Sequence, residues 1–445
     1  MNESDILDWV VKPLDQIANT RRGITYSAEM LESPDDGLPY VNMKSFLKGG
    51  GFNVFGTKKY SGKYTDGDLV NDNDLLIANT DVTAGDIVGV PALLPVELRT
   101  EDVLFSHHVT RLRVTADVIV PFLYYLLCLP EYRSYMLRIA RGTTVLMLDM
   151  QAIKRVLIRA PKAKAEQQRI AEILTTIDEA IEQTEALIAK TQQIKAGLMH
   201  DLFTRGVTKN GELRPPRSEA PQLYKESSLG WIPKEWDTAR LSSFAASRPG
   251  AFVNGPFGSD LLTSELTDSG VPVIYVQDIK EDGYQRVSEA FVTEEKANEL
   301  HVCDVRSADV IVAKVGAPPG VAVIYTAEQR AVITQDVIRI RPAVDVVSEF
   351  LAGLLNSTVG SHAIGKITIE GTRARVSLTE FKCLVLPKPT RDEQQLISDG
   401  VSVASSKIAS ATVELAKLKL LKNGLMHDLL TGRVRVPTDP LSAPA

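Results

Sequence analysis

Two stretches of the sequence contain residue types that could bind phosphate or cleave nucleic acid. Gly360 to Lys366, GSHAIGK, fits the start of a phosphate-binding loop, but Ile367 stands where that loop needs Ser or Thr to hold magnesium. Asp309 and Lys314 belong to a strand-like run and lack the carboxylate–x–Lys spacing of a nuclease. The sequence also has no NPPY or DPPY motif of an amino-methyltransferase. These patterns predict a chain with no catalytic residues.

The histidines and cysteines do not form a metal-binding pattern either. His200 and His427 repeat inside two copies of GLMHDL, with no cysteine or second histidine nearby, so we interpret them as helix-end residues or partner contacts. Cys128, Cys303 and Cys383 are far apart and form no CxxC, which favours reduced thiols of a cytoplasmic protein. We therefore expect no metal site and no cofactor on this chain.

Composition and charge limit the possible classes of protein. A chain of 445 residues, 44% hydrophobic and 24% charged, can form ordinary cores in two or more domains. Its longest apolar run, around Phe122 to Leu129, is too short to span a bilayer, and we expect a cytoplasmic protein. The net charge of -6 does not attract DNA by itself, so DNA binding would require local clusters of Arg and Lys.

The elements that would position any site are organised around a long repeated stretch. Residues 166–207 and 393–434 both begin with EQQ and both contain GLMHDL, at a constant offset of 227. Pro161 and Pro389 lie just upstream, where a helix could not already be running. Thr390 with Glu393 predicts a capping box at the start of the second copy, and glycines 206 and 432 suit the two ends. Each copy is predicted to be one long amphipathic helix.

Apolar residues spaced by three and four predict that the two helices pack on each other through a coiled-coil-like seam. In the first copy the predicted seam is Ile170, Ile173, Ile177, Ala180, Thr184, Leu187, Thr191, Ile194 and Leu198, widened by Leu174, Ile181, Ile188 and Leu202. In the second copy it is Ile397, Val401, Ala404, Ile408, Ala411, Leu415, Leu418, Leu421 and Leu425. A local hairpin or an ordinary core helix is the alternative.

The globular regions before each helix also correspond, although their loops differ. DLLIA at 74–78 matches DVIVA at 309–313, VTRLRV at 109–114 matches VIRIRP at 337–342, and RGTTV at 141–145 matches EGTRA at 370–374. Strand-like runs mixed with a helix at 121–140, bent near Pro130, predict an α+β fold. Shared scaffolds with different loops indicate two related but non-identical recognition tasks.

These correspondences divide the chain into six predicted segments. They are residues 1–162, a first recognition domain; 163–206, a first spacer helix; 207–235, a polar linker; 236–389, a second recognition domain; 390–432, a second spacer helix; and 433–445, a tail.

Particular motifs give the sequence a family resemblance over essentially its full length. They are LGWIPKEW at 229–236, NGPFGSDL at 254–261, APKAKAEQQRI at 160–170, PKPTRDEQQLI at 387–397 and the two GLMHDL segments. With these motifs the chain resembles the specificity subunit of type I restriction–modification systems. It departs from the pattern at its start, where ILDWVVKPLDQIA replaces a GxIPxxW stretch.

The resemblance implies a fold, a function and partners. Two target recognition domains would alternate with two long antiparallel helices in a pseudo-two-fold repeat. Each domain would read one half of a split site in double-stranded DNA, and the helices would set the gap. Two methyltransferase subunits, and restriction subunits for cleavage, would carry S-adenosylmethionine and ATP. The alternative is a scaffold that binds proteins and not DNA.

Candidate site residues follow from side-chain chemistry on the corresponding loops. Exposed Arg, Asn, Gln and Thr can reach base edges or phosphates. The DNA-binding candidates on or next to these loops are Arg141, Thr143, Thr144, Thr372, Arg373 and Arg375, and further candidates of the second domain are Asn254, Ser259, Gln277 and Lys280. The candidates for partner binding are the apolar residues of the GLMHDL segments, Leu198, Met199, Leu202, Leu425, Met426 and Leu429.

Overall fold

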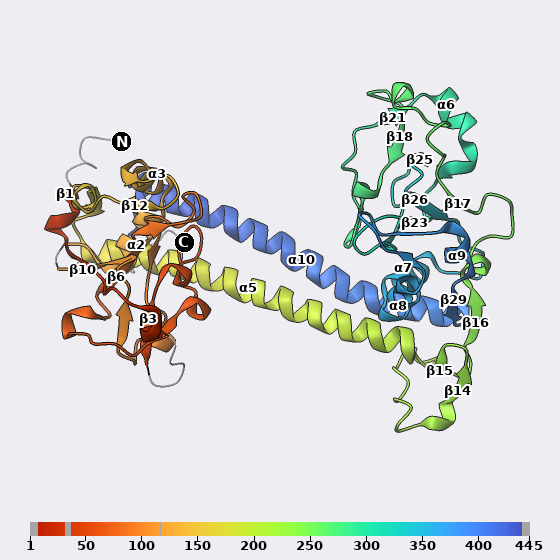
Figure 1. The fold of residues 1–445 in the computed structure, drawn as a ribbon, viewed down its shortest axis with the longest axis horizontal. Helices are drawn as coiled ribbons and strands as arrows, with labels where there is room; N and C mark the ends of the chain where they lie inside the picture. The colour runs from red at the N-terminus through yellow and green to blue at the C-terminus, as the bar shows by residue number, and fades with distance from the viewer. Residues whose placement is uncertain (1–7, 32–36, 116, 438–445) are drawn as a thin grey trace. The chain divides into compact units, whose positions relative to one another are not determined.

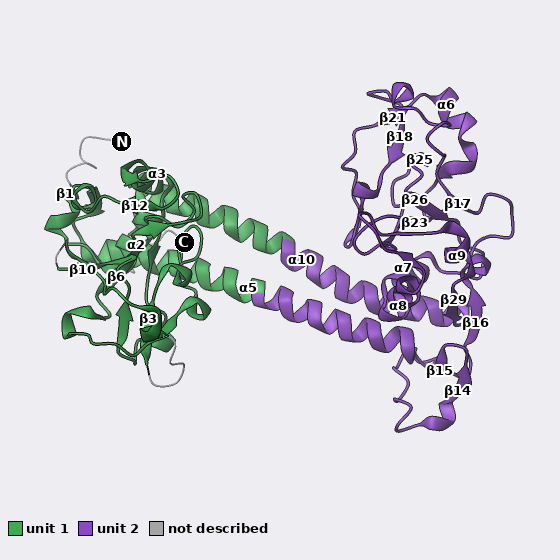
Figure 2. Ribbon diagram, viewed as in Figure 1, with its two compact units in different colours: residues 1–185, 413–445 green, residues 186–412 purple. Residues whose placement is uncertain are grey.

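A computed structural model describes residues 8–31, 37–115 and 117–437 of the chain. It divides into two compact units, residues 1–185 with 413–445 (unit 1) and residues 186–412 (unit 2) (Figure 2). The two boundaries are 227 residues apart, which is the offset of the sequence repeat. Each unit therefore contains one globular domain, one half of the first long helix and one half of the second.

Unit 1 is built on two four-stranded sheets. The first has the order β2 (Ala18–Arg22), β10 (Val109–Val114), β6 (Asp74–Ala78), β8 (Pro91–Ala92) and is antiparallel. The second has the order β4 (Lys58–Tyr60), β3 (Leu38–Val41), β9 (Val103–Phe105), β5 (Leu69–Val70), with β3 and β9 parallel. Beside them lie β1 (Trp9–Pro13) paired with β13 (Leu157–Pro161), and the ribbon β11 (Ala140–Arg141), β12 (Leu146–Leu148), β7 (Thr80–Asp81). The helices are α2 (Val120–Cys128), α3 (Pro130–Ile139) and α4 (Met150–Lys154).

Unit 2 repeats both four-stranded sheets strand for strand. The first is β17 (Phe252–Asn254), β26 (Val337–Ile340), β23 (Val310–Ala313), β24 (Ala322–Ile324), and the second is β21 (Phe291–Val292), β18 (Val271–Ile274), β25 (Ala331–Ile333), β22 (Asp304–Val305). Strands β18 and β25 are parallel, as β3 and β9 are in unit 1. The other pairs are β16 (Asp237–Arg240) with β29 (Val385–Lys388), β27 (Thr368–Ile369) with β28 (Arg375–Val376), and β19 (Ile279–Lys280) with β20 (Gly283–Tyr284). The helices are α6 (Glu294–Glu299), α7 (Ser348–Asn356), α8 (Thr358–Gly365) and α9 (Leu378–Cys383). The predicted α+β class is confirmed.

Acidic residues at equivalent strand starts are used inside the scaffold. Asp74 accepts two hydrogen bonds of 2.9 Å from Arg113, and Asp309 accepts bonds of 2.9 and 2.7 Å from Arg341. Both carboxylates are buried, so these bidentate pairs fix neighbouring strands to each other. Asp309 is therefore a structural residue.

The two long helices are α5 (Lys164–Thr204) and α10 (Arg391–Leu430), and each continues through both units (Figure 1). In unit 1, α5 and α10 run antiparallel, since ion pairs join Asp178 to Lys422 and Glu185 to Lys419. In unit 2, Leu202 near the end of α5 lies against Gly400 near the start of α10. The two helices are therefore antiparallel in this unit as well.

The predicted seam is wrong at three residues. Leu187 and Ile194 are 56% exposed and Leu421 is 52% exposed. The less exposed positions of α5 follow a strict heptad: Ile170, Leu174, Ile177, Ile181, Thr184, Ile188, Thr191, Lys195, Leu198 and Leu202. Those of α10 follow the same register, with Lys422 at the equivalent of Lys195. Leucine and isoleucine on the flank mimic a seam in the sequence, whereas the long aliphatic part of lysine can occupy the seam itself.

The EQQ motif joins each helix to its domain. Gln167 and Gln394 are fully buried, and each side-chain amide bonds three backbone groups. Gln167 accepts from Ile119 N and donates to the carbonyls of Asp117 and Pro161, at 2.7–2.9 Å. Gln394 makes the same bonds with Val347, Asp345 and Pro389, at 2.9–3.2 Å.

The neighbouring glutamates each pair with an arginine. Glu393 is buried and accepts from Trp236 Nε1 at 2.9 Å, Val207 N at 3.0 Å and Arg214 Nη2 at 3.0 Å. Glu166 accepts bonds of 2.7 and 2.8 Å from Arg435. The predicted capping box is only half present, because Thr390 Oγ1 accepts from Glu393 N at 3.4 Å while the Glu393 carboxylate is taken by the buried arginine.

The segment predicted as a linker, residues 207–235, is folded as part of unit 2. It contains the hairpin β14 (Tyr224–Ser227) and β15 (Gly230–Pro233), and its Arg214 is buried against Glu393. Residues 433–437 of the predicted tail include Arg435, whereas 1–7 and 438–445 lie outside the described residues. Glycines 206 and 432 have positive φ at the two helix ends, as the repeat predicts. Among the described residues, no helix has the length and hydrophobicity needed to cross a membrane.

Candidate nucleic-acid interface

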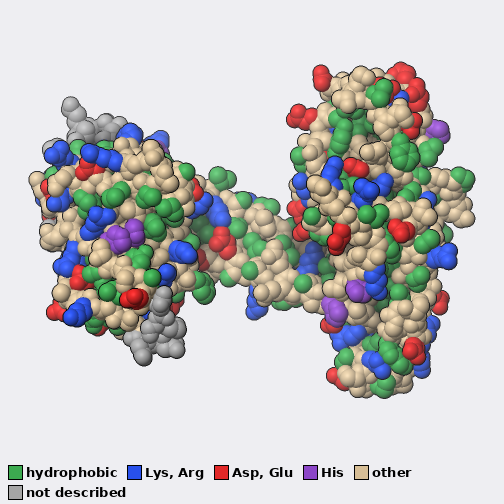
Figure 3. Space-filling model, in the orientation of Figure 1, with side chains coloured by type: hydrophobic (Ala, Val, Ile, Leu, Met, Phe, Trp, Pro, Cys, Tyr) green, Lys and Arg blue, Asp and Glu red, His purple; other side chains and the backbone are tan. Residues whose placement is uncertain are grey.

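In unit 1 two adjacent histidines lie at the junction of β9 and β10. The rings of His107 and His108 are 3.8 Å apart, and Tyr26 lies 5.6 Å from the first and 6.3 Å from the second. Arg22 of β2 donates to the His107 carbonyl at 2.9 Å. Figure 3 shows histidine side chains at the surface of this unit with Lys and Arg side chains around them. This surface combines aromatic rings, hydrogen-bonding nitrogens and positive charge.

The structure places the first predicted loop beside these histidines. Residues 142–145 connect β11 to β12, and β12 pairs with β7 so that Met147 lies opposite Thr80. Thr80 Oγ1 is 2.8 Å from His108 Nδ1. Thr143 and Thr144 are exposed on this loop. Arg141 is 82% exposed and forms an ion pair of 2.6 Å with Asp149.

In unit 2 the equivalent positions are occupied by Gln335 and Asp336, and four backbone hydrogen bonds establish the equivalence. Ser106 N donates to Val41 O (2.8 Å), as Thr334 N donates to Ile274 O (3.1 Å). Val109 N to Ser106 O and Gly23 N to Val109 O match Val337 N to Thr334 O and Gly255 N to Val337 O. Asn79 N donates to His108 O (2.7 Å), and Lys314 N to Asp336 O (2.9 Å). The second residue of the dipeptide and the residues that flank the dipeptide are thus hydrogen-bonded alike in both units.

The second predicted loop also lies beside its dipeptide. Arg375 bridges to Val315, and Gly316 N donates to Ala374 O at 3.1 Å. Arg373 is 72% exposed and approaches Asp336 at 3.9 Å, while Thr372 is exposed on the same loop. Arg373 and Gln277 line one hollow of about 550 Å³ together with Gln335 and Asp336.

The remaining unit 2 candidates are less closely grouped. Ser259 is exposed next to Gly258, which lines the hollow. Asn254 is half-buried on β17 and donates to the Gly255 carbonyl at 3.1 Å. Lys280 lies on the β19–β20 hairpin and does not line the hollow. The structure therefore brings together Gln277, Arg373 and the 370–374 loop, and leaves Lys280 outside this group.

The surroundings of the two histidines lower their pKa values, which favours the neutral rings. Burial lowers the pKa of His107, and the nearby positive charge of Arg22 lowers it further. Burial also lowers the pKa of His108, with additional contributions from His107 and Arg22. In addition, His107 Nδ1 is buried with no hydrogen-bond partner among the described residues, so a second ring proton there would be unsatisfied.

The predicted partner-binding residues are mostly inside the chain, and this prediction is wrong for three of them. Leu202 is buried in the core of unit 2, and Met426 and Leu429 are buried in the core of unit 1. Leu198, Met199 and Leu425 are partly buried against the same cores. Because each helix end carries a globular domain, the apolar side chains of GLMHDL pack against the core of that domain. His200, in the same motif, lies 3.2 Å from Thr358 Oγ1.

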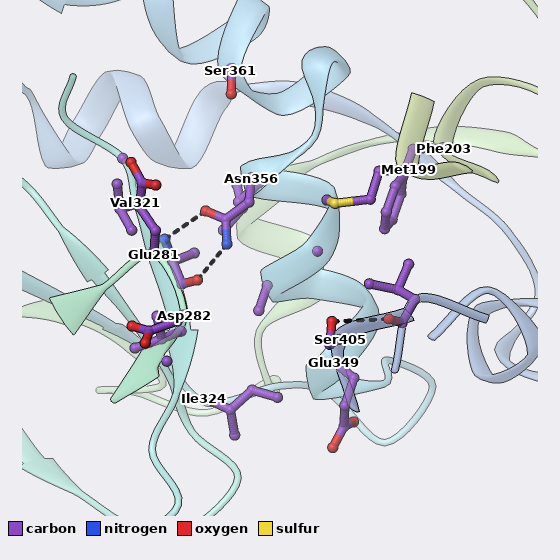
Figure 4. Close-up of a pocket in the computed structure, with 18 of the residues that line it drawn as sticks. Met199, Phe203, Glu281, Asp282, Val321, Ile324, Glu349, Asn356, Ser361 and Ser405 are labelled. Carbon is purple, nitrogen blue, oxygen red and sulfur yellow. Dashed lines mark hydrogen bonds between the residues drawn. The ribbon is translucent and has the colours of Figure 1, made fainter. Parts of the chain in front are cut away.

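Unit 2 also contains a cavity of about 690 Å³ that does not suit DNA (Figure 4). Met199, Phe203 and Ser405 of the long helices line it on one side, and Glu281 and Asp282 lie on another. Glu349 is a third acidic residue in the lining, and Lys195 is a basic one. Three carboxylates against one ammonium would repel a phosphate backbone.

Two positions that carry large side chains in unit 1 carry small residues in the lining of this cavity. Ala352 and Gly353 of α7 take the helix positions of Tyr124 and Tyr125 in α2, where the Tyr125 hydroxyl donates to Asp178 at 2.9 Å. At the position of Asp178, α10 has Ser405. The surfaces around His107–His108 and around Gln335–Asp336, and not this cavity, are therefore the candidates for nucleic-acid binding.

Sequence reasoning missed Arg22, Tyr26, His107 and His108 in unit 1, and Gln335 and Asp336 in unit 2. A signal was available in the sequence. SHHV at 106–109 ends at the first residue of VTRLRV, and TQDV at 334–337 ends at the first residue of the matching VIRIRP. The dipeptides differ in residue type between two otherwise matched segments, which indicates a position under a different functional requirement in each half.

Comparisons with known proteins show what the chain is similar to. Residues 6–193 match the family model described as Type I restriction modification DNA specificity domain. The Type I restriction enzyme MjaVIII specificity subunit of Methanocaldococcus jannaschii is 23% identical over 380 residues, covering 83% of this chain and 80% of that protein. The resemblance thus extends well beyond the segment that the family model matches.

Solved structures show the same fold. The crystal structure of a type I restriction–modification S subunit from M. genitalium has a TM-score of 0.57 at 16% identity, covering 95% of this chain and 96% of the other. A chain from a study of complex assembly and conformational transition of the type I restriction–modification system has a TM-score of 0.55 at 15% identity, covering 96% and 98%. The chain thus has the fold of these two-domain proteins. Residues 6–193 thus match the type I restriction modification DNA specificity domain, and the whole chain is similar to type I restriction–modification specificity subunits, as its sequence motifs predicted.

Proposed function

We propose that this chain is the DNA sequence-recognition subunit of a type I restriction–modification enzyme. Unit 1 reads one half of a bipartite site in double-stranded DNA and unit 2 reads the other. The long helices set the gap between the half-sites and dock two methyltransferase subunits. Restriction subunits join the assembly where cleavage occurs.

One observation carries this proposal: the two domains hold equivalent faces on a matched backbone and place different side chains there. His107 and His108 stand in unit 1 where Gln335 and Asp336 stand in unit 2. A repeated scaffold with changed surface residues is what reading two different base sequences requires.

Local charge supports DNA binding in spite of the net charge of -6. The face of unit 1 has Arg22 and Arg141, and that of unit 2 has Arg373 and Arg375, all of them exposed. Phosphate contacts depend on such local cations and not on the total charge.

The exposed flank of the long helices supports the docking of partners. Ile194 in unit 2 and Leu421 in unit 1 are exposed at equivalent positions of the repeat, 227 residues apart. Two like apolar positions suit two copies of one methyltransferase subunit. They replace the buried GLMHDL residues in this role.

The chemistry is assigned to the partners. S-adenosylmethionine binds to the methyltransferase subunits and ATP to the restriction subunits, and this chain binds neither. The GSHAIGK stretch supports this, since it forms part of α8 and not a loop after a strand.

The test is to purify the chain with its cognate methyltransferase subunits and to map methylated sites on genomic DNA. We expect one bipartite site with two different half-sites, and no methyl transfer by the chain alone. A protein-binding scaffold would leave the methylation pattern independent of this chain. Methyl transfer by the isolated chain would refute the assignment of chemistry to the partners.

A further inference from the structure

We infer that the dipeptides His107–His108 and Gln335–Asp336 are the residues that make the two half-sites different. The inference rests on the proposed function and adds to it the chemical class of base that each unit requires. Unit 1 requires hydrogen-bond acceptors on the base edges, and unit 2 requires an exocyclic amino group.

The backbone around the two dipeptides excludes a difference in position as the cause. Four equivalent hydrogen bonds hold each dipeptide and its flanking residues, on sheets with the same strand order. Gly23 and Gly255 fix the adjoining strand in both units, since an added Cβ would lie 2.1 Å from Phe105 O and 2.3 Å from Ile333 O, respectively. The side chains are therefore presented from the same place, and only their chemistry differs.

In unit 1 the contacts place the ring protons on the outer nitrogens. Thr80 Oγ1 lies 2.8 Å from His108 Nδ1 and 3.0 Å from the thioether of Met43. A ring nitrogen is the stronger acceptor of the two, so the hydroxyl donates to Nδ1, and the neutral ring carries its proton on Nε2.

The same tautomer holds for His107 for a different reason. Its Nδ1 is buried without a partner among the described residues, and an N–H there would cost more than a bare nitrogen. Both rings thus offer an Nε2–H donor, which suits the acceptors N7 and O6 of guanine or O4 of thymine in the major groove.

In unit 2 the dipeptide offers acceptors. The Asp336 carboxylate accepts only, so it requires the amino group of cytosine or adenine, and the exposed Gln335 amide can pair with adenine through N6 and N7. Arg373, 3.9 Å from Asp336, can donate to the guanine of a G·C pair whose cytosine faces the carboxylate.

The experiment exchanges the dipeptides within the complete complex with its methyltransferase subunits. We compare the wild type with H107Q/H108D and with Q335H/D336H, and determine both half-sites by methylation mapping and by binding to duplexes of defined sequence. The matched control is Glu97→Gln, an exposed change in unit 1 outside the face.

We expect H107Q/H108D to change the half-site read by unit 1 at one or two positions and to leave the other half-site unchanged. Q335H/D336H should do the reverse. Affinity for the original duplex should fall about tenfold, which corresponds to roughly 1.4 kcal/mol. The control should change neither half-site.

Unchanged half-sites in folded double variants would overturn the inference and leave the proposed function intact. An equal loss of affinity on every duplex would also overturn it, because phosphate contacts are then the role of the dipeptide. If a double variant does not fold, Asp336→Asn replaces it: this change preserves shape and should relax the requirement for an amino group in one half-site only. A wild-type complex without any bipartite site would instead refute the proposed function.

Discussion

The arginines of this chain divide into those held inside the domains and those left at the surface. Arg111 donates to the carbonyls of Gly67 and Leu69, and Arg339 donates to that of Val302. Both buried arginines therefore hold backbone groups inside their domains. Arg373 forms a long ion pair of 3.9 Å with Asp336 and remains exposed. Surface exposure and the shared hollow single it out for DNA contact.

Arg373→Ala should weaken recognition of one half-site by about 1–3 kcal/mol if the guanidinium pairs with a base. The loss should fall on the half-site of unit 2, because Arg373 belongs to that unit alone. Binding to duplexes with each half-site changed in turn measures the effect. An equal loss at both half-sites, or none, would count against this role.

The stability of unit 1 should fall in mild acid because of the histidine pair. Burial and the charge of Arg22 lower the pKa of His107 in the folded state, and burial, His107 and Arg22 lower the pKa of His108. The unfolded chain therefore binds these protons more readily, and the stabilisation by the neutral rings is lost as the pH falls through about 6.5 and below. Thermal unfolding between about pH 7.5 and about pH 5.5 should show a larger drop for the wild type than for H107Q/H108Q. Equal drops would remove the histidines as the cause.

At the scale of elements, the EQQ motif decides how a domain is attached to a helix. Its second residue supplies three hydrogen bonds to backbone groups in both units, and its glutamate pairs with an arginine from a segment after the other helix. The motif is thus repeated because the same joint is built twice.

Glu393→Gln should destabilise unit 2 by roughly 3–5 kcal/mol, the usual cost of breaking a buried ion pair. Burial lowers the pKa of Arg214, but the hydrogen bond and charge of Glu393 raise it. Without that carboxylate the charged guanidinium would be left with the longer ion pair of 3.5 Å to the more exposed Glu235. The matched variant Glu166→Gln should cost less, because Arg435 is 36% exposed and water can solvate it. Chemical unfolding of both variants tests this, and equal losses would contradict the role of burial.

The helix flank gives a further prediction at this scale. Ile194→Asp and Leu421→Asp place a charge on exposed positions and should leave the fold unchanged, yet each should weaken binding of a methyltransferase subunit. Sedimentation of the mixed subunits measures how many copies bind. Full binding by the double variant would show that this flank does not contact the partner.

At the scale of the whole molecule, the helices are proposed to set the gap between half-sites. One heptad inserted after Ala186 and one after Val413, at equivalent positions of the repeat, keeps the seam in register. Seven residues add about 10 Å of helix, so the gap should lengthen by about 3 base pairs of roughly 3.4 Å each. Methylation mapping should find both half-site sequences unchanged.

The control for this prediction is a heptad in one helix only, which shifts one seam against the other and should disrupt pairing of the helices. A gap of unchanged length in the protein with both helices extended would refute the proposal that the helices set the gap.

The sequence alone determined the repeat, the two long helices and the α+β class, because these depend on local periodicity and on a constant offset of 227. It also named the loops at 141–145 and 370–374 as candidates for DNA contact, and the structure places them beside the two dipeptides. Strands β6 and β10 and the helix break at Pro130 follow from the same local patterns.

Only the tertiary structure decided which apolar residues are free. Leu187 and Ile194 have the spacing of a seam, but the partner helix and the domains cover the neighbouring face, and Leu202 and Met426 are buried by contacts far away in the sequence. Likewise, the match between the β9–β10 and β25–β26 junctions shows that His107–His108 and Gln335–Asp336 occupy equivalent positions. Burial and equivalence in space depend on long-range packing, which the spacing of residues along the chain does not contain.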